Sequence, residues 1–321
     1  MKFDNYLLQL VDSRSSRNKE EICISGCSQL IKDIYDEVKH VRKKGAIKFI
    51  YQRLGIPYPT FYCWISGSNP IPIPKAYSLL RLWQIICNKS NVEFIENFNW
   101  LYKNSLGYSQ NAQRTIKLPR EIDCDLAYII GFFQGDGHLK KENNLKSQEY
   151  SIYFYEADEN MLNKINDILS DKFSIKGNIY FQKNETGSWY TLRISSKPIY
   201  LFFKNVLGLQ AGKKVRNVST PRIIKDSDDD AQLSFIRGFF DAEGGVGETT
   251  KCPWLDIGKD SNDYRSEILL WIRRRLEQEG IYLSEPKRPK NYEFFKIRTS
   301  KRETIKRFFE IISSDHPKKV G

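Results

Sequence analysis

Two carboxylates occupy the same place in two similar apolar segments. Asp136 stands near the end of GFFQGDG at residues 131–137, and Glu243 has the same position in GFFDAEG at residues 238–244. Two carboxylates that lie close together repel each other until cations arrive, and their hard oxygen atoms suit magnesium. A metal ion held there can lower the pKa of a bound water and make it a nucleophile. The pair therefore indicates a divalent-metal site at which water can be activated.

The two acids belong to an internal repeat. LAYIIGFFQGDG at residues 126–137 aligns without gaps on LSFIRGFFDAEG at residues 233–244, an offset of 107 residues. Both segments are too apolar for a surface helix, and glycine inside a helix costs about 1 kcal/mol relative to alanine. Close backbone contact between two helices would offset that cost. We predict that the two helices pack against each other about a pseudo-twofold axis. The small residues recur at every fourth position and form one ridge on each helix: Ala127, Gly131, Gly135, Ser234, Gly238 and Ala242.

The ends of these helices supply further oxygen ligands. The last carbonyl groups of a helix lack partners within the helix and carry a partial negative charge. We therefore assign Gly135 and Ala242, the residues directly before the acids, to the same magnesium site as Asp136 and Glu243. Manganese is expected to substitute for magnesium. The simpler alternative is that each acid is a solvated helix end before a glycine.

Each copy of the repeat continues with strands and helices. In residues 174–185 and 189–195 the side chains alternate in the strand manner, so that Ile175, Ile179 and Phe181 face a core. The opposite face carries long polar side chains. Helical spacing predicts helices over residues 156–173, 197–209, 266–280 and 303–312, and strands are expected over residues 254–259, 281–285 and 292–298. The acidic run DSDDD at residues 226–230 most simply caps the second motif helix.

The order of these elements predicts an α+β fold. Each repeat reads as helix, two strands, helix, two strands, helix, which gives two αββαββα halves. The predicted organisation is a small all-α N-terminal domain over residues 1–104, a polar linker over 105–120, the first repeat over 121–209, an inter-repeat linker over 210–229 and the second repeat over 230–321.

Positive charge is concentrated in the N-terminal third. The chain has 51 Lys and Arg against 39 Asp and Glu, a formal net charge of +12. Residues 1–120 hold 18 basic and 9 acidic side chains, so this third carries +9 of the total. Such a surplus points first to nucleic acid as a partner. A basic but inert surface is the alternative.

Residues 46–83 predict a helix-turn-helix arrangement, with Gly55 at the turn and Pro74 at the start of the third helix. Residues 57–66 would then be the recognition helix, with Tyr58, Thr60 and Tyr62 facing outward. An ordinary three-helix packing module is the alternative. The surrounding positive charge favours contact with DNA phosphates.

Residues 118–312 resemble the LAGLIDADG homing endonucleases of the single-chain type, on the strength of the two motif copies with an acid in the same place. In that family two sheets form a saddle over duplex DNA, the motif helices form the interface, and the two acids bind divalent metal and cut one strand each. The resemblance implies an intron-encoded, metal-dependent endodeoxyribonuclease. It implies a monomer that makes a double-strand cut in a long asymmetric DNA target.

The resemblance also implies roles for particular residues. Asp136 and Glu243 would be catalytic, and basic residues near such sites assist, a place that Lys259 matches in the second repeat. The matching place in the first repeat is expected to be Glu156, which is not basic, and Gln134 stands where the motif usually has another acid. The expected DNA-binding residues of the two sheets are Lys140, Lys176, Tyr180, Gln182, Arg193, Lys296 and Arg298.

Two other functions fit the same fold. An RNA-splicing maturase for a host intron would reuse the saddle for RNA, and a DNA-binding regulator would keep the helix-turn-helix beside an idle nuclease domain. Retention of both acids favours the nuclease. A free-standing enzyme is expected rather than an intein, because the chain starts at Met1 and lacks a terminal asparagine.

The expected cellular location follows from two features that the sequence lacks. The six cysteines form no CxxC pair and are expected to be reduced thiols, and no apolar run is long enough to cross a membrane. We therefore expect an intracellular protein without membrane partners, in the cytoplasm, the nucleoid or an organelle.

Overall fold

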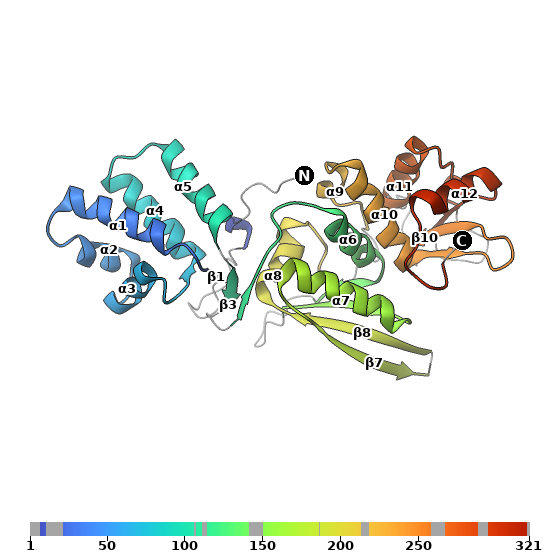
Figure 1. Ribbon diagram of the computed structural model, residues 1–321, viewed down its shortest axis with the longest axis horizontal. Helices are drawn as coiled ribbons and strands as arrows, with labels where there is room; N and C mark the ends of the chain where they lie inside the picture. Colours follow the sequence, from blue (N-terminus) through green and yellow to red (C-terminus); the bar gives the residue numbers. More distant parts are fainter. Residues whose placement is uncertain are drawn as a thin grey trace. The chain divides into compact units, whose positions relative to one another are not determined.

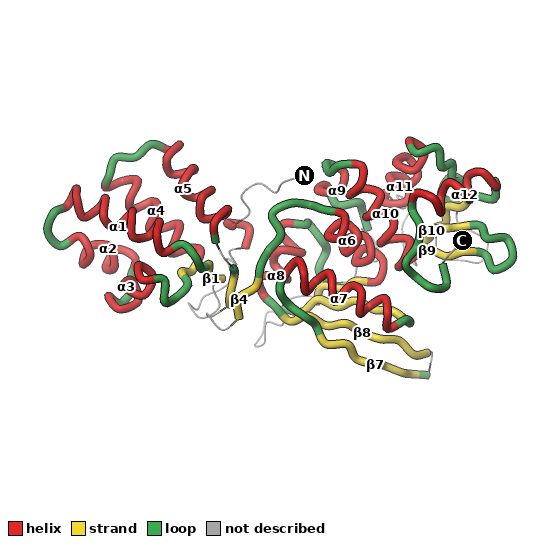
Figure 2. Tube along the Cα trace, in the orientation of Figure 1, coloured by secondary structure: helices red, strands yellow, loops and turns green. Residues whose placement is uncertain are grey.

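A computed structural model describes residues 7–10, 22–105, 107–110, 114–140, 150–185, 187–212, 218–257, 267–287 and 295–319. The chain divides into two compact units. The N-terminal unit comprises Phe3–Leu118 with Ser196–Val206, and the repeat unit comprises Pro119–Ser195 with Leu207–Gly321. Figure 1 labels helices and several of the strands of both units, and Figure 2 separates helices, strands and loops by colour.

The N-terminal unit is mostly helical. Gly55, in the left-handed conformation with φ of 62°, ends one helix, and Pro57 and Pro59 begin the next. The predicted turn at Gly55 and the start of a helix at Pro74 are thus confirmed. The helices are α1 (Ser28–Arg42), α2 (Ala46–Leu54), α3 (Tyr58–Ser66), α4 (Ile73–Ile86), α5 (Asn91–Asn104) and α8 (Lys197–Leu201), with a short 3₁₀ helix, η1 (Leu7–Leu10), and a short π-helix, η3 (Phe202–Val206).

The prediction that this domain is all-α was wrong. Antiparallel strands β1 (Ile22–Ile24), β2 (Ile71–Pro72), β3 (Tyr108–Gln110) and β4 (Arg114–Ile116) form a sheet in the order β2-β1-β3-β4. Two of these strands lie in the stretch predicted to be a polar linker. Strands of two or three residues are too short to show alternation, which is why the pattern did not reveal them.

The repeat unit contains the two halves predicted from the internal repeat. The first half consists of α6 (Cys124–Asp136), β5 (Gly137–Leu139), β6 (Ser151–Glu156), α7 (Glu159–Phe173), β7 (Asn178–Asn184) and β8 (Gly187–Ser195). The second half consists of α9 (Arg222–Lys225), α10 (Asp229–Glu243), β9 (Gly244–Val246), β10 (Pro253–Ile257), α11 (Glu267–Gln278), β11 (Phe295–Arg298) and α12 (Arg302–Ile311). The predicted helix after β8 packs with the N-terminal unit instead, as α8 and η3.

Each half has one antiparallel sheet backed by helices. The first sheet has the strand order β5-β6-β8-β7, and α7 packs on β6 and β8. The described strands of the second sheet have the order β11-β10-β9, and α11 packs on β10 and β11. Figure 1 shows α7 beside β8 in the first half. One face of each sheet is therefore covered by a helix.

Helices α6 and α10 form the interface between the halves, and their contacts are reciprocal. A Cβ atom added at Gly131 would lie 2.0 Å from the carbonyl oxygen of Phe235, and one added at Gly238 would lie 2.0 Å from the carbonyl oxygen of Tyr128. The two glycines and the two carbonyl residues are related by the same offset as the sequence repeat. This symmetry confirms the predicted packing of the two ridges about a pseudo-twofold axis.

Both motif helices begin at an aspartate. The Asp123 carboxylate accepts the Leu126 amide at 2.9 Å at the start of α6, and the Asp228 carboxylate accepts the Ala231 amide at 3.0 Å at the start of α10. Such a cap satisfies amide groups that have no partner in the first turn. The capping role predicted for the acidic run at residues 226–230 is confirmed.

Two details of the predicted sheets were wrong. Residues 281–285 are irregular: Ser284 pairs with Arg298 partly through its side-chain oxygen, and Pro286 has no amide hydrogen, so no strand ladder continues. Phe181, predicted in the core, is 59% exposed because it lies on β7, the edge strand, while α7 packs on β6 and β8. Its ring packs edge-on against Tyr190.

Substitution of the ridge glycines should destabilise the repeat unit strongly. Gly131→Ala or Gly238→Ala places a methyl group against a backbone carbonyl that cannot turn away, so we expect a loss of about 3 kcal/mol or more. Ser234→Ala, on the same ridge of α10 but without such a contact, should change stability by less than about 0.5 kcal/mol. Urea unfolding followed by tryptophan fluorescence measures both, and equal stabilities for all three variants would contradict the close packing.

Candidate functional site

The two acids lie at adjoining helix ends. Asp136 is the last residue of α6 and Glu243 the last residue of α10. A Cβ atom added at Gly135 would lie 2.5 Å from the Cβ of Ala242 and 2.7 Å from the Cγ of Glu243. The structure thus brings together all four residues assigned to the metal site from the sequence. Both acids are half-buried, so solvent reaches them.

The donors gathered there suit a hard divalent cation. Two carboxylates and the carbonyl ends of two helices offer oxygen atoms, the kind of ligand that magnesium and manganese prefer. Among the described residues, no group of three or more His, Cys, Asp or Glu side chains is arranged to hold a metal ion. Water or a phosphate oxygen would therefore have to complete the coordination, which is how magnesium usually binds in enzymes of phosphate chemistry.

The C-terminal strap, defined here as residues 313–319, reaches this site and was missed by sequence reasoning. The Lys319 ammonium donates to the carbonyl oxygens of Phe240 at 3.3 Å, Asp241 at 2.5 Å and Ala242 at 3.0 Å, at the end of α10. Burial lowers the pKa of Lys319, and Glu156, Asp241, Asp136 and Glu243 oppose that shift. A positive charge from the end of the chain thus lies within electrostatic reach of both acids. The chain pattern carries no signal for it.

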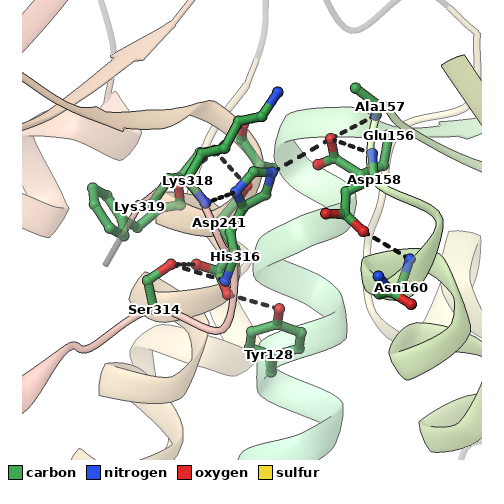
Figure 3. A network of polar contacts seen from close by, with 12 residues as sticks. Tyr128, Glu156, Ala157, Asp158, Asn160, Asp241, Ser314, His316, Lys318 and Lys319 are labelled. Carbon is green, nitrogen blue, oxygen red and sulfur yellow. Dashed lines mark hydrogen bonds and ion pairs between the residues drawn. The ribbon is translucent and has the colours of Figure 1, made fainter. Parts of the chain in front are cut away.

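Asp241 anchors the strap. Its side chain is fully buried, and its oxygens accept hydrogen bonds from the Tyr128 hydroxyl at 2.8 Å, the Ser314 hydroxyl at 2.5 Å and the Asp315 amide at 3.3 Å. Figure 3 shows these contacts running from α6 through Asp241 to the strap. Burial first, and then the charge of Asp241, raise the pKa of Tyr128, which stays a hydrogen-bond donor. The carboxylate therefore joins α6, α10 and the strap.

Gln134 has the place in α6 that Asp241 has in α10, two residues before the acid. It is buried, and its amide donates to the carbonyl oxygen of Ser219 at 2.9 Å. In both halves this helix position holds a neighbouring segment, which agrees with the expectation that Gln134 is no metal ligand.

Glu156 faces the strap from the first half. Its carboxylate lies 3.6 Å from the Nε2 of His316 and accepts the Ala157 amide at 2.6 Å. Burial acts to raise the pKa of Glu156, but the nearby His316 and the Ala157 amide outweigh burial and lower the pKa. Figure 3 shows His316 between Glu156 and the backbone of Lys318. The strap is thus fixed to both halves of the repeat unit.

The predicted equivalence of Lys259 and Glu156 does not hold. Gly137 pairs with Phe154, and its counterpart Gly244 pairs with Leu255, so Ile257 takes the position equivalent to Glu156. The sequence-based alignment of the two strands that contain Glu156 and precede Lys259 was shifted by two residues. Lys259 itself lies outside the described residues.

The uncovered face of the first sheet carries the polar side chains expected for DNA. Arg193 lies opposite Asn178 and Tyr153, and Tyr180 lies opposite Thr191. The Gln182 side chain accepts from the Trp189 indole at 2.9 Å and the Thr191 hydroxyl at 2.8 Å. These residues share one face because side chains alternate along paired strands.

Lys140 and Lys176 take different places from those strand residues. Lys140 follows β5 directly, and its amide pairs with Ser151 on β6, so it extends the sheet. Lys176 precedes β7 and forms an ion pair with Asp167 of α7 at 3.1 Å. It lies beside the helix that covers the sheet and not in the strand.

An aromatic row on the same uncovered face was also missed. The rings of Tyr153 and Tyr155 stack at 6.2 Å with an interplanar angle of 6°, and His138 lies 6.2 Å from Tyr153. The Arg193 guanidinium lies 5.9 Å from the centre of the Tyr153 ring. The strand alternation in residues 151–156 could have revealed part of this row, because Tyr153 and Tyr155 are two residues apart and so lie on the same face.

The second sheet presents a different set of side chains. Lys296 and Arg298 lie on β11 opposite Asp256 and Trp254. The Lys296 ammonium is 3.8 Å from the Asp256 carboxylate and 4.3 Å from the centre of the Trp254 ring. Burial raises the pKa of Asp256 and lowers the pKa of Lys296. The two uncovered faces therefore present different side chains.

On the N-terminal unit, α3 exposes the tyrosines expected to face outward. Tyr58 is 46% exposed and Tyr62 57% exposed, while Thr60 is half-buried. Phe61 and Trp64 pack on the opposite side into the core. Nearby, the Arg42 guanidinium lies 3.7 Å from the centre of the Phe49 ring.

All six cysteines are free thiols. No helix in the described part of the chain has both the length and the apolar character needed to cross a membrane.

Comparison with known proteins was informative for the repeat unit. Residues 123–207 match the family model for a LAGLIDADG-like domain. The chain is 26% identical over 193 residues to the homing endonuclease I-DmoI of Desulfurococcus mucosus. This alignment covers 59% of this chain and 87% of I-DmoI. It is 25% identical over 201 residues to the homing endonuclease I-ApeI of Aeropyrum pernix, covering 60% of this chain and 82% of that protein. This chain spans only 6–17% of the length of six other curated relatives that it matches.

The solved structures include a crystal structure of I-DmoI in complex with DNA and Mn. I-DmoI in that structure shares 24% sequence identity with this chain, and the superposition has a TM-score of 0.45. The superposition covers 61% of this chain and 99% of the I-DmoI chain. Residues 123–207 are thus similar to a LAGLIDADG-like domain, and over 59–60% of its length the chain is similar to two homing endonucleases.

Proposed function

We propose that this protein is a site-specific endonuclease that makes a magnesium-dependent double-strand cut in a long asymmetric DNA target. The observation that carries the proposal is the meeting of Asp136 and Glu243 at the ends of two helices in backbone contact, between two half-saddles. A duplex has two strands related by local twofold axes. Two acids with the same pseudo-symmetry can serve both strands in one docking event.

The residues of the chain would divide the work as follows. Asp136 and Glu243 would hold the divalent cations, together with the carbonyl group of Gly135 and that of Ala242, which Lys319 also contacts. Bound magnesium would lower the pKa of a water nucleophile and stabilise the leaving oxygen of an in-line displacement. The chain itself would supply the geometry: the contact between the two helices sets where the two carboxylates stand, and the sheets would place the phosphodiester groups beside them.

The uncovered sheet faces support recognition of an asymmetric target. The first face offers Tyr180, Gln182 and Arg193 beside the aromatic row, while the second offers Lys296 and Arg298 beside Trp254 and Asp256. Arginine and lysine can contact guanine or phosphate, and glutamine can contact adenine. Because the two faces differ, we propose that the half-sites they read differ as well. Both acids come from one chain, so a monomer suffices.

The N-terminal unit would add affinity. We assign α3 as the recognition helix of a helix-turn-helix, with Tyr58, Thr60 and Tyr62 toward DNA. The positive charge of residues 1–120 would neutralise phosphates without sequence preference. A protein with this activity works in the compartment that holds its DNA target.

The acids can be tested one at a time. Asp136→Asn and Glu243→Gln keep the size of each side chain and remove its charge, so each should lower the rate of double-strand cleavage by on the order of 10³ or more. The substrate is a plasmid that carries the two DNA segments flanking the intron expected to encode this protein, joined directly to each other. It is incubated with the protein and magnesium or manganese. Glu303→Gln, an exposed acid at the start of α12, is the matched control and should cleave normally. Full cleavage by the double acid variant would refute the site.

The sheet contacts can be tested by the salt dependence of binding. Arg193→Ala and Arg298→Ala should each weaken binding to the same target and reduce the slope of log affinity against log salt by about 1. Lys306→Ala, on α12 and 79% exposed, is the control and should leave the slope unchanged. Fluorescence anisotropy in chelator, which prevents cleavage, measures the slopes. Unchanged slopes for both arginine variants would place the DNA elsewhere, and a preference for the matching RNA would favour a splicing role.

A further inference from the structure

The C-terminal strap carries a charge to the acid pair that no motif of the repeat contains. Lys319 has three ammonium hydrogens, and it lies within hydrogen-bond distance of three carbonyl oxygens at the end of α10. That end carries the partial negative charge of the helix and is followed at once by the Glu243 carboxylate. An ammonium in this place stabilises both the end of α10 and the Glu243 carboxylate.

The same ammonium lies close to the partner helix. The ends of α6 and α10 touch at Gly135, where an added Cβ would be 2.5 Å from Ala242, and Ala242 is one of the residues that Lys319 contacts. Asp136, which directly follows Gly135, therefore shares the region with Lys319. The electrostatic influence of both acids on the Lys319 ammonium agrees with this placement.

The strap is built to hold Lys319 there. The buried Asp241 carboxylate binds Ser314 and the Asp315 amide, Lys164 of α7 forms an ion pair with Asp315, and His316 lies against Glu156. The Lys319 amide in turn donates to the His316 carbonyl oxygen at 2.9 Å. Contacts from both halves thus fix the backbone of the strap. The Lys319 ammonium is therefore positioned by this backbone as well as by its own hydrogen bonds.

We propose that Lys319 is a tethered cation of the acid pair: its ammonium offsets the charge of Asp136 and Glu243 and holds the two helix ends together until a divalent cation binds beside it. Two like charges near one site oppose each other, so Lys319 weakens divalent-cation binding while it stabilises the metal-free protein. Lys319 is a positioning residue for the acids. The part that concerns the divalent cation rests on the proposed function.

Calorimetric titration of the full chain with calcium or manganese tests the opposition. Lys319→Met should bind either ion at least about fivefold more tightly than the unaltered protein, because a repelling charge is gone. Lys319→Arg keeps the charge and should bind as the unaltered protein does. Lys318→Met, with an exposed side chain one residue away, is the matched control and should also be unchanged. Equal or weaker binding by Lys319→Met would show that Lys319 is a helix cap only and would overturn the proposal.

A second measurement, made in chelator, does not depend on metal binding. Lys319→Met should lower the melting temperature of the repeat unit, and the loss should be at least halved in a Glu243→Gln background, where the charge to be offset is smaller. Equal losses in both backgrounds would overturn the role of Lys319 at the acid pair. If neither calcium nor manganese binds to the unaltered protein, the proposed function fails, while the coupling in chelator still decides what Lys319 does.

Discussion

The contact between α6 and α10 leaves no room for a side chain at two positions. Gly131 and Gly238 each face a carbonyl oxygen of the opposite helix so closely that even a methyl group would overlap it. The contact also sets where the two sheets begin, because each motif helix leads directly into the first strand of its own sheet at Gly137 or Gly244. The position of the acids follows as well, since each is the last residue of its helix. Packing and site geometry are therefore set by the same few residues.

The two halves share this interface but differ around it. On the first sheet an aromatic row lies beside Arg193, whereas the second has the half-buried pair of Asp256 and Lys296 next to Trp254. Asp241 binds the C-terminal strap, while its counterpart Gln134 binds the backbone of Ser219. A symmetric frame thus supports asymmetric surroundings, which suits a target whose two halves are not identical.

The parts of the fold that sequence could predict are those with a local pattern. Gly131 and Gly238 recur with the acids at a constant offset, so the paired helices and the meeting of their ends followed from spacing alone. The short strands β1 to β4 carry no such pattern. The strap is held by contacts between residues far apart in the chain, such as Ser314 with Asp241, and hydrogen bonds of this kind leave no periodic trace. Lys319 therefore could not be found by motif, although it reaches the same helix end as the predicted ligands.

The central claim is that the glycine contact makes one shared cation site from two carboxylates. Crystals of the protein soaked in manganese allow a direct measurement, since anomalous scattering locates the metal independently of the protein. The account predicts anomalous density between the helix ends, in contact with both Asp136 and Glu243. Manganese bound only at other surfaces, or the two carboxylates facing different sides of the molecule, would contradict it.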